Sequence, residues 1–118
     1  MKPDMSILQT RRMVLRAMVE SDANALFQVF CDPVVCKYWS SSSHNTIEQT
    51  KKYIQQSIEE RNQQTWVITL ENNEALGWIY LGDSKQGVAE LGFILHRDKW
   101  GRGLASEAAA RVIAHGFE

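Results

Sequence analysis

The sequence predicts one three-layer α+β domain, with a mostly antiparallel sheet flanked by helices. Its 118 residues fit a single domain, and 44% of them are hydrophobic, which is enough for a core without disulfides or a structural metal. The hydrophobic pattern predicts elements in the order β-α-α-β-β-β-α. Strands and helices alternate too little for a doubly wound parallel sheet, so we expect α+β packing across residues 1–118.

The periodicity of hydrophobic residues places each element in turn. The expected ranges are a strand at 11–18, a helix at about 23–31, a loop at 34–45, a helix at about 46–60, strands at 65–70, 75–82 and 88–95, and a helix at 103–118. Ser21 and Asp22 offer side-chain oxygens that can cap the first helix, and Asp32-Pro33 ends it. The strands at 65–70 and 75–82 are expected to form an antiparallel hairpin.

Charge is distributed unevenly along the chain. Residues 17–95 contain five basic and ten acidic side chains, which excludes a general nucleic-acid surface. The basic residues gather at 1–16 and 96–111, and the second group lies beside glycines, where it suits one small polyanion. No apolar run approaches the length of a membrane span, and the first ten residues lack the apolar stretch of a signal peptide. We therefore expect a cytoplasmic domain without membrane or nucleic-acid partners.

Two cysteines, Cys31 and Cys36, are five positions apart. This spacing is outside the range that structural zinc prefers, and the three histidines do not supply a second ligand pair. A disulfide is disfavoured in a reducing compartment. We expect both cysteines to act as small buried hydrophobic residues, and we expect no metal site.

The segment at 88–108 carries the strongest chemical signal. An apolar strand leads through a short basic loop to Gly101 and Gly103, and a helix follows. Glycines allow a tight turn, and the free amides of a helix start attract an anion such as phosphate or pyrophosphate. The chain has no Gly-Lys-Ser/Thr ending for a P-loop, and Ser106 stands where a dinucleotide fingerprint needs a third Gly or Ala. A glycine turn without a ligand is the alternative, but the strand, basic loop and helix around it favour a site.

These residues resemble motif A of the GCN5-related N-acetyltransferase (GNAT) superfamily. Its signature, Gln/Arg-x-x-Gly-x-Gly/Ala, falls on Trp100, Gly103 and Ala105. Trp100 departs from Gln/Arg, but an aromatic residue there is typical of the ribosomal-protein-alanine acetyltransferase (RimJ/RimL-like) branch. The amino-terminal signature of that branch is matched by Leu15-Arg16, Asp22-Ala23, Leu26, Asp32-Pro33 and Tyr38-Trp39. The resemblance covers about residues 11–118.

The resemblance implies acetyl-CoA as co-substrate. Backbone groups near 93–95 would pair with the pantetheine arm and polarise the thioester carbonyl, and main-chain N–H groups of 101–106 would hold the pyrophosphate. The implied cofactor-binding residues are Phe93, Ile94, Leu95, Trp100, Gly101, Arg102, Gly103, Leu104, Ala105 and Ser106.

The implied reaction is direct attack of a primary amine on the thioester. Glu90, the only charged residue in its apolar strand, matches a family glutamate and is the candidate general base. A structural role, in solvent or paired with an arginine, is its alternative. Tyr38 and Trp39 would border the acceptor pocket, although core packing is equally compatible with Trp39. The acceptor would be a protein N-terminus, an amino acid or a small amine.

The family fold continues after motif A, whereas this sequence ends at Glu118. The resemblance therefore predicts a domain that is incomplete at its C-terminus, without the strand beside 88–95 or the residue that protonates the departing thiolate. A strand with an open apolar edge is expected to self-associate, for example as a dimer. The alternative to an active enzyme is a truncated homologue that binds CoA or oligomerises without catalysis, and a third possibility is a fragment that binds neither.

Overall fold

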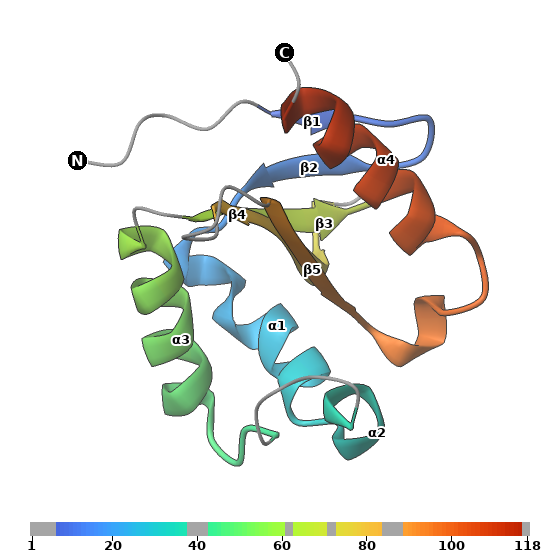
Figure 1. The fold of residues 1–118 in the computed structure, drawn as a ribbon. Helices are drawn as coiled ribbons and strands as arrows, with labels where there is room; N and C mark the ends of the chain where they lie inside the picture. Colours follow the sequence, from blue (N-terminus) through green and yellow to red (C-terminus); the bar gives the residue numbers. More distant parts are fainter. Residues whose placement is uncertain (1–6, 38–42, 61–62, 71–72, 84–88, 117–118) are drawn as a thin grey trace.

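The computed structural model describes residues 7–37, 43–60, 63–70, 73–83 and 89–116. Figure 1 shows the arrangement of its elements. In chain order these are β1 (Leu8–Gln9), β2 (Val14–Ala17), α1 (Ala23–Phe30), α2 (Pro33–Cys36), α3 (Ile47–Glu59), β3 (Gln63–Thr69), β4 (Ala75–Asp83), β5 (Ala89–Leu95) and α4 (Leu104–Gly116). Short 3₁₀ turns at Glu20–Asp22 and Arg97–Lys99 precede α1 and α4.

The five strands form one sheet in the order β1-β2-β3-β4-β5, and every neighbouring pair is antiparallel. Helices α1 and α3 lie on one side of this sheet and α4 lies on the other (Figure 1). The three-layer α+β prediction is therefore confirmed. The order of the strands also makes β5 the last strand of the described sheet, directly before the glycine turn.

Each face of the sheet carries its own hydrophobic core. On one face, Leu26 and Phe30 of α1 and Ile54 of α3 pack with Val67 and Trp78 of the sheet. The core under α4 is formed by ten buried residues: Leu8, Met13, Leu15, Trp66, Ile68, Ile79, Leu95, Leu104, Ala108 and Val112. Neighbouring strand residues such as Trp66 and Val67 point to opposite faces of the sheet. Both are fully buried because helices cover both faces.

Three details of the predicted elements were wrong. The strand expected at 11–18 begins only at Val14, because the amide of Thr10 bonds to the carbonyl of Met13 and closes a turn there. The turn connects to β1, a two-residue strand that the sequence pattern did not reveal. The loop predicted at 34–45 contains most of α2. The Asp32 carboxylate caps this helix by accepting the amide of Val34, and Pro33 occupies its first turn.

The cysteines lie near α2. Cys36 is buried, Cys31 is partly buried, and both are free thiols. Burial raises the pKa of the Cys36 thiol. Within the described ranges, no cluster of three or more side chains is arranged to hold a metal ion, and no helix has the length and hydrophobicity to cross a bilayer.

Candidate functional site

The turn between β5 and α4 needs glycine at two positions. Gly101 has φ +78° and Gly103 has φ +74°, both in the left-handed region that side-chain-bearing residues avoid. Space is not the constraint, because a Cβ at Gly101 would meet nothing within 4 Å and one at Gly103 would stay 3.5 Å from Arg12. Backbone conformation is therefore what requires these two glycines.

A cavity of about 380 Å³ opens at this turn. It is lined by Phe93, Leu95, Lys99, Trp100, Gly101, Gly103, Leu104, Ala105 and Ser106. The residues come from the end of β5, the glycine turn and the first turn of α4, so unpaired helix amides and the positive end of the helix dipole lie at its wall. Lys99 adds a cation. The cavity combines an apolar strand wall with an anion-attracting end.

Ile94 and Arg102, two of the residues predicted to bind the cofactor through their backbone, are not among the residues that line the cavity. Ile94 is 4% exposed and packs in the core with α1 and α3, on the opposite face from Phe93 and Leu95. Arg102 is exposed and is not part of the cavity wall. The prediction concerned the backbone at Ile94, so its buried side chain leaves that part untested.

Trp100 holds the segment between the end of β5 and the glycine turn in place. Its indole N–H donates to the carbonyl of Leu95 at 3.0 Å, while the ring remains 41% exposed. The amide of His96 donates to the carbonyl of Leu76 at 2.7 Å, which holds the end of β5 against β4. His96 Nδ1 also accepts the amide of Asp98 at 3.2 Å, so this histidine caps the 3₁₀ turn.

On the other face of β5, an aromatic ring lies over the strand. Tyr80 of β4 is the register partner of Gly92, and a Cβ at Gly92 would approach a carbon of the Tyr80 ring to 2.3 Å. The glycine therefore makes room for the ring. Tyr80 begins an aromatic group that continues through Trp78 and Tyr53 to Phe30, with ring centroids 5.0–6.0 Å apart.

Two titratable groups in this aromatic region are kept uncharged. Burial raises the pKa of Tyr53 to about 12, and burial lowers the pKa of His44. His44 Nδ1 lies 2.8 Å from the hydroxyl of Thr50. Both rings are therefore neutral at pH 7 and contribute packing and hydrogen bonds.

The remaining candidate residues are only partly covered by the structure. The backbone of Glu90 pairs with Gly82 in the β4–β5 ladder, but its side chain lies outside the described residues. Tyr38 and Trp39 also lie outside them. Their roles as general base and acceptor-pocket residues stay predictions.

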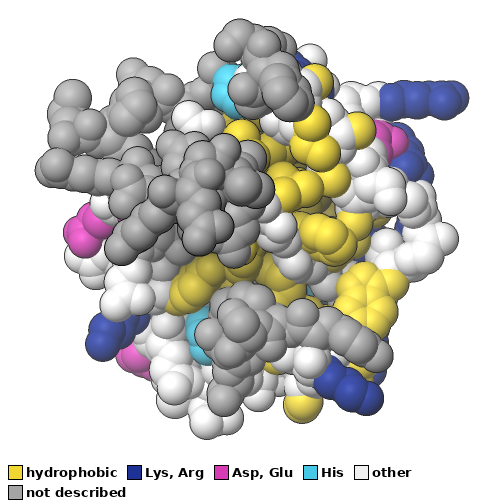
Figure 2. Space-filling model, viewed as in Figure 1, with side chains coloured by type: hydrophobic (Ala, Val, Ile, Leu, Met, Phe, Trp, Pro, Cys, Tyr) yellow, Lys and Arg dark blue, Asp and Glu magenta, His cyan; other side chains and the backbone are white. Residues whose placement is uncertain are grey.

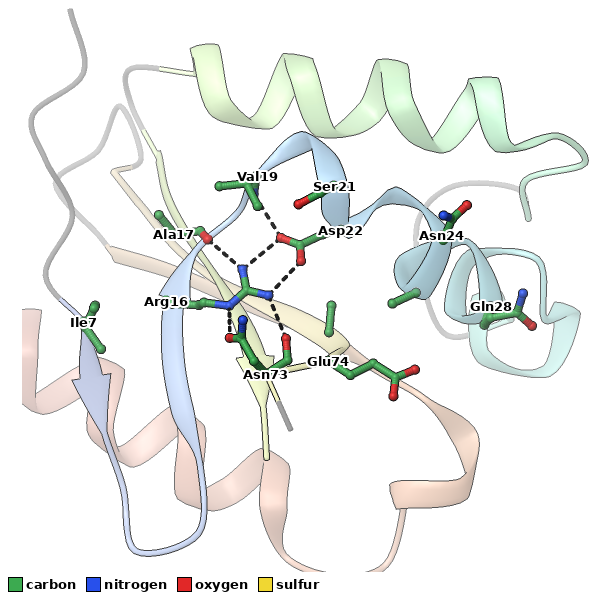
Figure 3. A pocket seen from close by; sticks show the side chains of 12 residues that line it. Ile7, Arg16, Ala17, Val19, Ser21, Asp22, Asn24, Gln28, Asn73 and Glu74 are labelled. Carbon is green, nitrogen blue, oxygen red and sulfur yellow. Dashed lines mark hydrogen bonds and ion pairs between the residues drawn. The ribbon is translucent and has the colours of Figure 1, made fainter. Parts of the chain in front are cut away.

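A larger cavity, of about 770 Å³, lies between β2 and α1 (Figure 3). Arg16 points into it, but all five N–H donors of the guanidinium are used: two bonds reach the Asp22 carboxylate, two reach Asn73 and one reaches the carbonyl of Ala17. Asp22 was predicted to cap α1. Its carboxylate instead accepts Arg16 and the amide of Val19, because pairing a buried charge takes precedence over a cap. Arg16 thus has a structural role here.

Hydrophobic side chains also reach the surface beside β5. Leu91 is 36% exposed, Phe93 51% and Trp100 41%. Figure 2 shows hydrophobic side chains gathered at the surface on the part of this face where Figure 1 places β5. The apolar wall of the smaller cavity is therefore continuous with an exposed strand surface.

Three residues that hold the glycine turn in place were not predicted from the sequence. Thr10 and Arg12, in the turn between β1 and β2, bond to Glu107 of α4, and Arg12 also bonds to the carbonyl of Arg102. These partners are separated by 90–97 residues, so no local pattern connects them.

Comparison with known proteins agrees with this geometry. The family model for the acetyltransferase (GNAT) domain matches residues 12–118. The uncharacterized N-acetyltransferase p20 of Bacillus licheniformis is 35% identical over 119 residues, covering 96% of this chain and 67% of that protein. The chain therefore belongs to the GNAT acetyltransferase family, a family of enzymes.

Solved structures show the same fold. A GNAT-family acetyltransferase from Bacillus anthracis superposes with a TM-score of 0.84 at 22% identity, covering 95% of this chain and 66% of that one. An acetyltransferase from Salmonella typhimurium superposes with a TM-score of 0.74 at 22% identity, covering 93% and 67%. The chain thus spans about two thirds of the length of these relatives.

Proposed function

We propose that this chain binds acetyl-CoA and transfers its acetyl group to a primary amine. The observation that carries the proposal is the left-handed Gly101–Gly103 turn, which opens at the start of α4 into a cavity with an apolar strand wall. Free helix amides suit a pyrophosphate, and the apolar wall suits a pantetheine arm. The residues present therefore fit the co-substrate that the family uses.

In the proposed site, main-chain N–H groups of residues 101–106 hold the pyrophosphate, and Lys99 adds a positive charge beside them. Phe93 and Leu95 line the path of the pantetheine arm along β5. Bound acetyl-CoA supplies the thioester: the amine nitrogen forms a bond to its carbonyl carbon, the carbon–sulfur bond breaks, and sulfur leaves as the thiolate. The proton lost by the amine passes to Glu90, directly or through water.

We propose a protein N-terminus, an amino acid or a small amine as the acceptor, with Tyr38 and Trp39 at the acceptor pocket. The Salmonella typhimurium structure is described as an acetyl transferase that modifies the N-terminal serine of the 50S ribosomal subunit protein L7/L12. That description and the RimJ/RimL-like sequence signature support the first of these acceptors. Self-association through the edge of β5 that has no neighbour among the described strands stays a prediction.

Replacing Gly103 with valine is expected to weaken CoA binding at least tenfold, since a β-branched residue is strongly disfavoured at φ +74° and the turn must rearrange. Calorimetric titration with CoA measures the change. Gly103→Asn is the matched control, because asparagine also adds a side chain but tolerates the left-handed region, so it should bind more tightly than the valine variant. Unchanged affinity of the valine variant would exclude this turn as the pyrophosphate site.

Replacing Glu90 with glutamine is expected to slow acetyl transfer by a factor of about 10²–10⁴, the usual contribution of a general base, while CoA affinity stays unchanged. Release of the free CoA thiol in the presence of primary amines measures transfer. Glu48→Gln, at an exposed position of α3, is the control for loss of one carboxylate and should keep full turnover. Equal turnover of the Glu90 and Glu48 variants would remove Glu90 as the base.

A second candidate function is CoA binding without catalysis. The position of β5 at the end of the described sheet favours it, because among the described strands the cavity has a strand on one side only. CoA binding by calorimetry without thiol release from acetyl-CoA would support this function over the transferase.

A further inference from the structure

The glycine turn is attached to a distant part of the chain. Glu107, in the first turn of α4, accepts bonds from the hydroxyl of Thr10, from the backbone amide of Arg12 at 3.0 Å and from Arg12 Nε at 2.8 Å. Thr10 Oγ1 in turn accepts the amide of Met13 at 3.0 Å. The turn between β1 and β2 is therefore folded around this one carboxylate.

Arg12 connects the same group to the backbone of the glycine turn. Its Nη1 donates to the carbonyl of Arg102 at 2.8 Å. The carbonyl of Arg102 and the N–H of Gly103 belong to one trans peptide, so they point in opposite directions. Holding the carbonyl toward Arg12 therefore directs the Gly103 N–H away from Arg12. The cavity wall includes Gly103 and not Arg12, which places the guanidinium behind the turn.

We propose that Arg12 is a positioning residue for the cofactor: with Glu107 as its anchor, it orients the Arg102–Gly103 peptide so that the turn presents its N–H groups to the pyrophosphate. The inference rests on the proposed function of this turn and adds a residue 90 positions away from it. Arg12 acts through the peptide it holds and does not touch the co-substrate.

The charges of the group are consistent with this role. A carboxylate near the start of a helix would repel a bound pyrophosphate, and the ion pair with Arg12 neutralises Glu107. Hydrogen bonds from Thr10 and Arg12 lower the pKa of the Glu107 carboxyl, so the carboxylate persists at neutral pH and is lost only when the pH falls through this lowered value. The anchor is thus intact under physiological conditions.

The test compares CoA affinity among arginine variants of the 118-residue chain. Arg12→Ala is expected to weaken CoA binding about tenfold, since a hydrogen bond from a charged donor no longer orders the turn. Arg12→Lys is expected to lose nearly as much, because an ammonium cannot form the fork that joins Glu107 to the Arg102 carbonyl. Arg11→Ala is the matched control: Arg11 is exposed, and the described part of the chain shows no bond from it to the turn. Its affinity should stay within about twofold of the wild type.

Amide hydrogen exchange separates positioning from general stability. Loss of the Arg12 bond should speed exchange at residues 101–106 while the buried amides of β3 keep their protection. Faster exchange throughout the chain would indicate a merely structural role and overturn the inference. If Arg12→Ala does not fold, Arg12→Lys and Glu107→Gln provide the same comparison.

The two proposals fail in distinguishable ways. No CoA binding by the wild type would contradict the proposed function and the inference with it. Wild-type binding with equal affinity in the Arg12 and Glu107 variants would overturn the inference alone. A loss in Arg12→Ala that Arg12→Lys fully restores, or that Arg11→Ala matches, would reduce the role of Arg12 to its charge and also overturn the inference.

Discussion

Replacing Arg16 with alanine is expected to lower the free energy of unfolding by about 3–5 kcal/mol, the usual result of removing one partner from a buried ion pair. The Asp22 side chain is 7% exposed, and without Arg16 its carboxylate keeps only the amide of Val19 among the bonds seen here. The two bonds to Asn73, which hold the segment before β4, are lost as well. Chemical denaturation followed by circular dichroism measures this change.

Arg97 provides the matched control. It also pairs with an aspartate, Asp32, at 3.2 Å, but 53% of its side chain is exposed. An exposed ion pair contributes at most about 1 kcal/mol, because water and salt screen it. Arg97→Ala should therefore change stability far less than Arg16→Ala. Similar losses in the two variants would contradict a special role for burial at Arg16.

Replacing Gly77 with alanine is expected to be nearly as damaging, at about 3 kcal/mol or more, since overpacking against rigid neighbours forces the backbone to move. A Cβ at this position would lie 2.0 Å from the carbonyl oxygen of Ile94 and 2.9 Å from Cα of Leu95. These are backbone atoms of β5, so the two strands must separate. Because β5 supplies the apolar wall of the cavity, CoA binding should fall together with the melting temperature.

Gly92→Ala tests the same change in the same pair of strands. The three atoms nearest to its Cβ all belong to the far end of the Tyr80 side chain, which can move. This variant should lose less stability than Gly77→Ala. A larger loss at Gly92 than at Gly77 would show that the aromatic packing, and not strand spacing, dominates here.

The longer elements could be predicted from the sequence because their signals are local. Strands expected at 75–82 and 88–95 are found at Ala75–Asp83 and Ala89–Leu95, and the helix expected at 46–60 is Ile47–Glu59. Thr46 caps that helix by accepting the amide of Gln49. In contrast, β1 has two residues and α2 has four, too few to show a hydrophobic period, although Asp32 and Pro33 are a local start signal for α2.

The candidate site likewise has a part that could be predicted from the sequence and a part that could not. The glycine turn could be predicted because its conformational requirement is local, and both glycines do have positive φ. The roles of Arg12 and Glu107 could not, because an ion pair between two surface-type residues leaves no pattern in a single sequence. Asp22 illustrates the converse error: it does stand at the N-cap position of α1, but its carboxylate pairs with Arg16 and makes no cap bond, so the predicted cap was wrong.

The bonds from Thr10 and Arg12 to Glu107 join residues 95–97 positions apart, so the proposed anion site would be completed late in folding. At a synthesis rate of about 5–20 residues per second, the turn between β1 and β2 leaves the ribosome roughly 5–20 seconds before its carboxylate partner. Contacts of such long range close only after more local structure has formed. If the proposed site is correct, the sheet can assemble on a nascent chain before the co-substrate can be held, and binding competence follows only when α4 docks.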